Sequence, residues 1–447
     1  MKTEVAIVGG GPGGSTSAMF LLREGIKPVI IEKESFPRYH IGESMTGECG
    51  GIIRELGLAP KMLRPRHPVK HGVKVFGKNP WFVPVMARGV DGKLQDQTTW
   101  QVRRSDFDQM MLKEAVARGA TLIQGKATRP LVDDDGAVRG VEVRLADGGT
   151  LEIESELLLD CSGQSTFLAH AGVTGPKYLG RYDKQIAIFS QITGGIRDEG
   201  GSKETQRDNT LIFYKQKYHW AWWIPIDDEV VSVGIVSPAA YFLDKKESKA
   251  EFVARELHQL HPELKRRIPE VKLVEEALAI PNYSYQIKDF SGKGFICIGD
   301  AHRFLDPIFS FGLYVTMKEA QIAAPFVKAY LEGANRDTLN PFAEYQLYCE
   351  KGLDILEDVL DAFWEHPLSF TVLVNLRHRE DLIDMFAGRI YENQPSPGLI
   401  SFRDLLKRER TYECKDNNFS VPIGSRFHPE RAPLWEEEAT IAVSDLR

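Results

Sequence analysis

A glycine-rich turn near the start of the chain has the spacing of a phosphate-binding loop. It follows the apolar run Val5–Val8, fits the pattern Gly-x-Gly-x-x-Gly, and includes Gly9, Gly11, Pro12, Gly13 and Gly14. Backbone N–H groups of such a turn can approach a pyrophosphate, and the dipole of the following helix favours its negative charge. Glu32 lies about 20 residues further on, where a carboxylate can bind a ribose hydroxyl. The spacing predicts a dinucleotide site, for which FAD and a nicotinamide cofactor are both candidates.

Two later turns could contact other parts of a long cofactor. Asp160 ends a buried-looking strand and is followed by a small-residue turn that contains Gly163. Asp300 ends the apolar run 294–299, where its carboxylate could bind a ribityl hydroxyl. The helix expected after Gly312 and Leu313 offers free N–H groups and a partial positive charge to an anion or a reduced ring. These spacings favour one cofactor that extends across a whole domain.

Further cofactor-binding candidates lie in a loop and at one helix start. An arginine can reach a cofactor phosphate, and a glycine lets a flat ring lie close to the backbone. A helix is expected over 105–118, with Ser105 as its N-cap. The alternatives are ordinary loop residues and solvated surface charges. The candidates are Lys33, Arg38, Gly42, Glu43, Ser44 and Arg104.

Lysines and tryptophans in two strand-like segments could also contribute to a site. Lys70 and Lys74 lie in residues 66–84, although most lysines are solvated and the pattern alone selects neither. The segment 219–225 carries Trp220 and Trp222 and ends at Pro225. Its large rings could alternate between a core and a pocket, or could form an aromatic wall beside a flat cofactor or substrate.

The composition excludes several classes of protein. The 447 residues carry a net charge of −7, with 27% charged and 43% hydrophobic residues, which is typical of a globular enzyme and not of a nucleic-acid-binding protein. No apolar run reaches membrane-spanning length. The five cysteines are scattered without a Cys-x-x-Cys pair, so we expect free thiols, no metal site and a cytoplasmic location.

The chain resembles the FAD-dependent monooxygenase superfamily and, within it, the flavin-dependent halogenases. The first halogenase signature is matched by Trp220-x-Trp222-x-Ile224-Pro225, and the second by Phe304-x-x-Pro307-x-x-Ser310-x-Gly312. The resemblance covers about residues 1–330. It implies an α/β fold with a Rossmann-like, para-hydroxybenzoate hydroxylase-like FAD-binding domain, an inserted antiparallel substrate sheet and a C-terminal helical region. The expected boundaries are 1–180 and 281–333 for the FAD-binding domain, 181–280 for the sheet, and 334–447 for the C-terminal region.

The resemblance also implies a reaction. Halogenases use FAD, reduced by a separate flavin reductase, and O2 to form a C4a-hydroperoxide, which converts chloride or bromide to hypohalous acid. Lys70 best fits the family's catalytic lysine, with Lys74 as runner-up, and Ser310 belongs to the second signature. The acidic residue of tryptophan-directed members is replaced by Phe309, which favours the branch acting on phenols or pyrroles, some of them carrier-tethered.

Three alternatives to a halogenase remain open from the sequence. They are an aromatic monooxygenase of the same fold, a flavin-dependent oxidoreductase of the geranylgeranyl-reductase type, and a non-catalytic flavoprotein. Phe311 and the residues after Gly312 depart from the usual second signature near the expected halide site. Turnover with reduced FAD, O2 and halide distinguishes the four.

Overall fold

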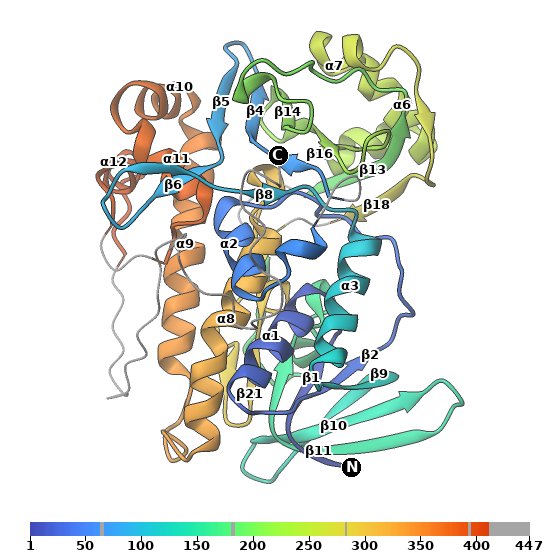
Figure 1. Cartoon of the computed structure of the whole chain (residues 1–447), viewed down its shortest axis with the longest axis vertical. Helices are drawn as coiled ribbons and strands as arrows, with labels where there is room; N and C mark the ends of the chain where they lie inside the picture. Colours follow the sequence, from blue (N-terminus) through green and yellow to red (C-terminus); the bar gives the residue numbers. More distant parts are fainter. Residues whose placement is uncertain (63–66, 180–183, 282–283, 392–394, 411–447) are drawn as a thin grey trace.

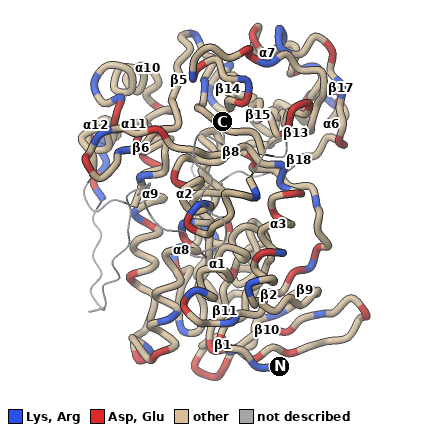
Figure 2. Tube along the Cα trace, in the orientation of Figure 1, with Lys and Arg blue, Asp and Glu red and all other residues tan. Residues whose placement is uncertain are grey.

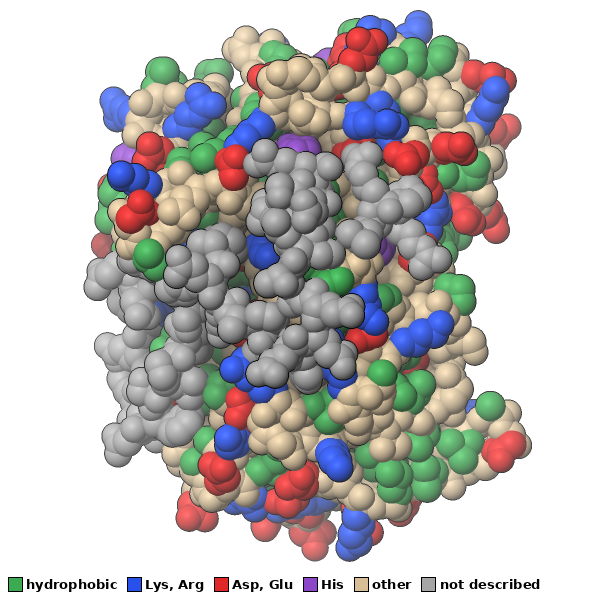
Figure 3. All heavy atoms as spheres, in the orientation of Figure 1, with side chains coloured by type: hydrophobic (Ala, Val, Ile, Leu, Met, Phe, Trp, Pro, Cys, Tyr) green, Lys and Arg blue, Asp and Glu red, His purple; other side chains and the backbone are tan. Residues whose placement is uncertain are grey.

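A computed structural model describes residues 1–62, 67–179, 184–281, 284–391 and 395–410. Residues 411–447, which include Cys414 and the end of the C-terminal region expected over 334–447, lie outside the described residues. A mixed sheet with its helices occupies the lower half of Figure 1, a second sheet lies above it, and the last helices stand along one side. Positions of Lys and Arg and positions of Asp and Glu alternate along the trace of the described residues (Figure 2). Outside the grey atoms, the face in Figure 3 also shows no extended area of one charge.

The first sheet brings the expected cofactor turns to one edge. It has seven strands in the order β1-β2-β9-β10-β11-β21-β20, with a further β1–β11 pairing. Val8 pairs with Asp160 and Asp160 with Cys297, both in parallel strands, so the turns after these strands are neighbours. The strands are β1 (Lys2–Val8), β2 (Val29–Glu32), β9 (Thr121–Val132), β10 (Val138–Leu145), β11 (Thr150–Asp160), β20 (Ser291–Gly292) and β21 (Phe295–Cys297).

Helices pack around this sheet, and the first of them begins in the glycine turn. They are α1 (Pro12–Arg23), α2 (Gly47–Glu55), α3 (Arg104–Ala117), the short α4 (Phe167–His170) and α8 (Gly312–Leu331). The expected N-cap at Ser105 is wrong, because α3 begins one residue earlier and Arg103 occupies the cap position. Ser105 therefore lies inside the first turn, and the side chain of Arg104 enters the site from the very start of the helix.

The second sheet contains the expected antiparallel strands and two strands from the first segment of the chain. Its order is β17-β13-β16-β15-β14-β4-β5, with β18 beside β13. The strands β4 and β14 pair in parallel, so the sheet is mixed at this edge. Its strands are β4 (Gly72–Phe76), β5 (Trp81–Pro84), β13 (Gln185–Thr193), β14 (Thr210–Gln216), β15 (His219–Pro225), β16 (Val231–Pro238), β17 (Lys272–Leu273) and β18 (Leu278–Pro281).

Strand β15 is buried along its whole length and alternates between two cores. Trp220 and Trp222 pack into the core shared with the FAD-binding part. Trp223 packs on the opposite face of the sheet, in a second core with residues of α6 (Lys249–Gln259) and α7 (Pro262–Arg267). The period of a strand thus directs the two signature tryptophans toward the same side. The short α5 (Ala239–Lys245) follows β16.

Small two- and three-stranded sheets join these parts. They are formed by β3 (Val69–Lys70) with β8 (Thr99–Trp100), β6 (Met86–Arg88) with β7 (Leu94–Asp96), and β19 (Tyr285–Ile287) between β12 (Lys177–Leu179) and β22 (Arg303–Phe304). The β3–β8 pair places Lys70 opposite Thr99, within the body of the protein.

The C-terminal region is helical. It contains α9 (Ala343–Glu365), α10 (Pro367–Val372), α11 (Arg379–Ala387) and α12 (Pro397–Leu406). Phe342 precedes α9 at the N-cap position, and its N–H donates to Asn340 Oδ1 at 2.9 Å. No helix in the described part of the chain is long and apolar enough to span a membrane.

Candidate active site

Side chains do not fit at several positions of the glycine turn. A Cβ at Gly14 would overlap the carbonyl oxygen of Gly9, and one at Gly9 would overlap that of Cys161. A Cβ at Gly11 would meet only the Arg38 guanidinium, at 3.4 Å. Pro12 begins α1 directly after Gly11, whose position carries no side-chain cap. The helix therefore presents uncapped N–H groups over an open glycine, which fits a pyrophosphate.

Glu32 lies buried at the end of β2, facing this turn. Its Oε2 accepts from the Gly10 N–H at 2.7 Å and its Oε1 accepts from the Glu34 N–H at 2.7 Å. The carboxylate is thereby fixed beside the turn, as a ribose-binding group requires. Lys33 is instead a surface residue, half exposed and 3.9 Å from the Glu34 carboxylate. Glu32 therefore faces the glycine turn, whereas the Lys33 side chain lies at the surface.

Two arginines meet at one buried carboxylate next to the turn. Arg104 donates two hydrogen bonds to Asp108, at 2.7 and 2.9 Å, and also donates to the Gly42 carbonyl at 3.3 Å. Arg38 lies 3.3 Å from the same Asp108. Asp108 is fully buried one helical turn after Arg104. The spacing of four residues is visible in the sequence, but Asp108 was not among the expected site residues. The group keeps a net positive charge beside Gly11, which favours a phosphate.

The aspartates of the two later turns, Asp160 and Asp300, have different surroundings. Asp160 is fully buried, and its carboxylate accepts from the Ser162 and Leu168 N–H groups at 3.0 and 2.8 Å. It therefore shapes the turn that contains Gly163, which adopts φ of 61° with open space where a Cβ would be. Asp300 lines a pocket, and burial raises the pKa of its carboxyl to about 7. A polar group of a cofactor would supply the hydrogen bond that this buried carboxyl favours.

Lys70 is a buried amine without a counter-charge among the described residues. Its Nζ lies 2.8 Å from Ser44 Oγ and 2.8 Å from the Met45 carbonyl oxygen. Its neighbour Cys49 on α2 contacts Met317 of α8, Sγ to Sδ at 3.6 Å. Burial lowers the pKa of Lys70 to about 7, so a large fraction of the amine is neutral near neutral pH.

One of the two signature tryptophans, Trp222, is connected by hydrogen bonds to the loop that also carries Ser44. Trp222 Nε1 donates to Ser232 Oγ at 3.1 Å, and Ser232 Oγ donates to Glu43 Oε2 at 3.2 Å. Glu43 is 1% exposed, its Oε1 has no partner, and burial raises its pKa to about 7. The Trp220 and Trp222 ring centroids are 6.0 Å apart. Both rings are thus held in a water-excluded wall that ends at the buried Pro225.

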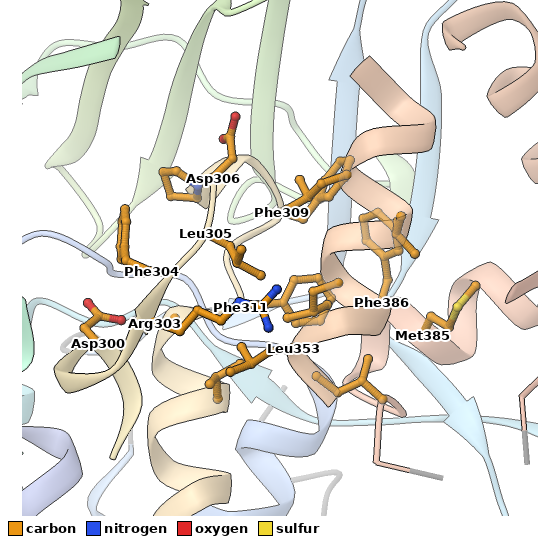
Figure 4. Close-up of a pocket in the computed structure, with 17 residues that line it drawn as sticks. Asp300, Arg303, Phe304, Leu305, Asp306, Phe309, Phe311, Leu353, Met385 and Phe386 are labelled. Atoms are coloured by element: carbon orange, nitrogen blue, oxygen red, sulfur yellow. The ribbon is translucent and has the colours of Figure 1, made fainter. Parts of the chain in front are cut away.

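The second signature forms one side of a pocket (Figure 4). The loop turns sharply at Ser310, which is half-buried with φ of 60°. Gly312 begins α8 with open space around its Cα, whereas Leu313 is buried. The lining includes Asp300, Phe304, Pro307, Phe309, Phe311 and Gly312 from this side, and Leu353, Leu356, Met385 and Phe386 from α9 and α11.

Two of these pocket elements come from the C-terminal region. The helices α9 and α11 form the wall opposite the second signature, which gives a role to a region where no motif could be recognised. Phe309, at the position of the acid in other members, packs against Phe386 with centroids 4.6 Å apart. The pocket is therefore mostly apolar, as an aromatic substrate requires.

Comparisons with known proteins agree with this geometry. Residues 2–346 match a family described as FAD binding domain. A 1H-pyrrole-2-carbonyl-(peptidyl-carrier protein) brominase of Pseudoalteromonas luteoviolacea is 35% identical over 408 residues, covering 90% of this chain and 96% of the relative. A 1H-pyrrole-2-carbonyl-(peptidyl-carrier protein) chlorinase of Pseudomonas fluorescens is 27% identical, covering 90% and 93%. The solved structure of the flavin-dependent brominase Bmp2 matches with a TM-score of 0.84 and 35% identity, covering 91% of this chain and 98% of Bmp2.

Proposed function

The chain belongs to the flavin-dependent halogenases, and we propose that its substrate is a pyrrole carried as a thioester by a peptidyl-carrier protein. The relatives that match nearly their whole length are named for such substrates, which supports the proposal. The apolar pocket between the second signature and α11 suits a small flat ring at the end of a flexible arm. We expect chloride or bromide and O2 as the other substrates, and a separate flavin reductase as the source of reduced FAD.

The residues of the glycine turn, with Glu32, Arg38 and Arg104, would bind the dinucleotide part of FAD. Asp300 and the start of α8 at Gly312 would bind its flavin part. When bound, reduced FAD supplies the activation of O2 that oxidises the halide. The open N-terminus of α8 offers N–H groups and a partial positive charge to the halide anion.

Lys70 carries the proposal. A buried neutral amine can donate one N–H to the oxidised halide or accept the halogen at its lone pair, whereas an ammonium ion can only donate. Because Ser44 and Met45 hold Nζ in place, the amine can direct the oxidant toward the pocket. The Trp220–Trp222 wall excludes water, which would consume the oxidant, and separates the organic substrate from the flavin.

The experiment is a turnover assay with defined components. The purified protein receives reduced FAD, O2, chloride or bromide, and a pyrrolyl thioester on a carrier protein, and mass spectrometry follows the carrier. We expect halogenated pyrrole on the carrier, and no halogenation by the Lys70→Met variant. Hydroxylated product, or rapid NAD(P)H oxidation by the protein alone, would instead identify a monooxygenase. Free pyrrole-2-carboxylate tests whether the carrier is required.

A further inference from the structure

A chain of buried side chains leads from Lys70 to Gln101. Lys70 Nζ lies 2.8 Å from Ser44 Oγ, and Ser44 Oγ lies 2.8 Å from Thr210 Oγ1. Gln101 Nε2 donates to Thr210 Oγ1 at 2.8 Å. All four residues are at most 3% exposed, so water does not compete for these contacts. The chain joins the Ser44 loop to the first residue of β14.

Gln101, at the end of this series of hydrogen bonds, acts toward Thr210 only as a donor. Gln101 Nε2 also donates to the Asp208 backbone carbonyl oxygen at 3.1 Å, which fixes the orientation of the amide because a carbonyl only accepts. Ser44 and Gln101 also face each other in an isolated antiparallel bridge, which sets the distance between the two ends. Thr210 therefore meets a permanent N–H donor on one side and the Ser44 hydroxyl on the other.

The direction of the hydroxyl hydrogens decides which form of Lys70 the chain fits. If Lys70 is an ammonium ion and donates to Ser44, the Ser44 O–H points to Thr210. The Thr210 O–H then has no acceptor among the described residues, since Gln101 also donates to it. If Lys70 is neutral, Thr210 donates to Ser44 and Ser44 donates to the Nζ lone pair, so both hydroxyl hydrogens have acceptors. Burying an unsatisfied donor is unfavourable, and the chain fits the neutral amine.

We propose that Gln101 and Thr210 are positioning residues, which orient the Ser44 hydroxyl toward Lys70 and so hold its amine neutral for the oxidised halide. This inference rests on the proposed role of Lys70. It adds to burial, which by itself lowers the pKa of Lys70 to about 7. The two effects act in the same direction and on the same nitrogen.

The other titratable groups near Lys70 do not take over the role of this hydrogen-bond series in setting the protonation state of the amine. Cys49, on α2, faces Lys70, and burial raises the pKa of its thiol to about 12, so it stays uncharged. Glu43 and Glu48 flank Ser44 in sequence, but their carboxylates contact Ser232 and Arg389. No carboxylate is recorded in contact with Lys70 in the described part of the chain. The hydroxyl chain is thus the polar environment that can respond to a substitution.

The test replaces the terminal donor with an acceptor of the same size. In Gln101→Glu, the carboxylate accepts from Thr210, Thr210 accepts from Ser44, and Ser44 accepts from an ammonium ion. We expect the pKa of Lys70 to rise by about one unit or more. It is measured by 13C NMR titration of the full-length protein labelled with [ε-13C]lysine, and the Lys70→Met variant assigns the resonance.

A double-mutant cycle separates the chain from the added charge. Thr210→Val alone should leave the pKa of Lys70 near the wild-type value. In this variant the ammonium form of Lys70 still leaves one hydroxyl without an acceptor, now that of Ser44, and the neutral form still satisfies it. In Gln101→Glu/Thr210→Val the charge remains while the connection is broken, so the rise should be smaller than in the single variant. Equal rises in the single and double variants, or no rise in Gln101→Glu, would overturn the proposal.

Two further measurements keep the result independent of folding and of the proposed function. If Gln101→Glu does not fold, Thr210→Asp supplies the acceptor one position closer to Lys70 and should give the same rise, and its absence would refute the chain. Halogenation by the variants should lose activity below the raised pKa and recover above it. If the titration follows the prediction while Lys70→Met still halogenates, the chain is supported and the role of Lys70 is not.

Discussion

Lys70 and Lys74 lie four residues apart and in opposite surroundings. Lys70 is 3% exposed and held by Ser44 and Met45, whereas Lys74 Nζ is 2.8 Å from Glu204 Oε1 with 17% of its side chain exposed. The difference arises because Lys70 ends β3, inside the body of the protein, and Lys74 lies within β4, next to the edge strand β5 of the second sheet. A sequence window of five residues thus contains one amine suited to chemistry and one suited to a surface ion pair.

This difference predicts separate effects of the two lysines. Lys70→Met should lower the rate of halogenation at least about 100-fold, because the group that directs the oxidant is lost. FAD binding and the release of hydrogen peroxide should be unchanged. Lys74→Met, the matched control, removes only a partly exposed ion pair and should keep most of the rate. The opposite ranking, measured by product formation under saturating reduced FAD, would assign the role to Lys74.

The buried amine also predicts a stability that depends on pH. The pKa of Lys70 is lowered by burial from 10.5 to about 7, so between these values the unfolded chain binds a proton that the folded protein does not. The free energy of unfolding should therefore rise with pH in this window, by up to about 1.4 kcal/mol per pH unit. Urea unfolding at pH 7, 8 and 9 should show this slope as the difference between wild type and Lys70→Met. A difference that is flat or falls with pH contradicts the burial argument.

Gly11→Ala tests the phosphate-binding turn without breaking it. The new Cβ would meet only the end of Arg38, at 3.4 Å, so the protein should fold normally while the methyl group occupies the approach of the pyrophosphate. We expect at least a tenfold weaker Kd for FAD, roughly 1.4 kcal/mol. Gly77→Ala is a suitable control, because its Cβ would be 3.8 Å from Tyr214 and far from any cofactor turn. Fluorescence titration with FAD gives both constants, and equal affinities would argue against this turn.

Phe386→Ala should raise KM for the organic substrate and leave the Kd for FAD unchanged. The ring lines the pocket and packs against Phe309 at 4.6 Å. Its loss enlarges the pocket, so KM for the pyrrolyl carrier should rise several-fold while the Kd for FAD stays constant. Phe370→Ala is the matched control, since that ring stacks on Phe402 at 5.5 Å outside the pocket lining. Both should lose about 3–5 kcal/mol of stability, so a change of KM in both variants would indicate a general loss of packing.

The sequence predicted the parts of the site that follow from local patterns. The turns after β1, β11 and β21 were recognised because each is a buried strand followed by a small polar turn. Their meeting at one edge follows from parallel pairing, with Val8 opposite Asp160 and Asp160 opposite Cys297. The two signatures were recognised by their spacing, and the period of β15 directs Trp220 and Trp222 to one side.

The remaining parts depend on contacts between distant segments. Asp108, which joins Arg38 and Arg104, looks like an ordinary surface acid within an expected helix. Thr210 meets Ser44 across 166 positions of sequence, through a parallel β4–β14 pairing that no alternation pattern indicates. The N-cap at Ser105 was wrong because a serine in the first turn and a serine at the cap give the same pattern. Such features become visible only when the chain is folded.

The two sides of the pocket come from two segments of the sequence that have different roles. The side formed by residues 300–315 also carries the start of α8, which we propose binds the flavin, so we expect its shape to be constrained. The opposite side comes from α9 and α11, which carry none of the glycine turns. Substitutions in these helices can therefore alter which ring is accepted while oxidant formation continues. Exchanging residues 343–390 between relatives is accordingly a route to new aromatic products from an unchanged oxidising centre.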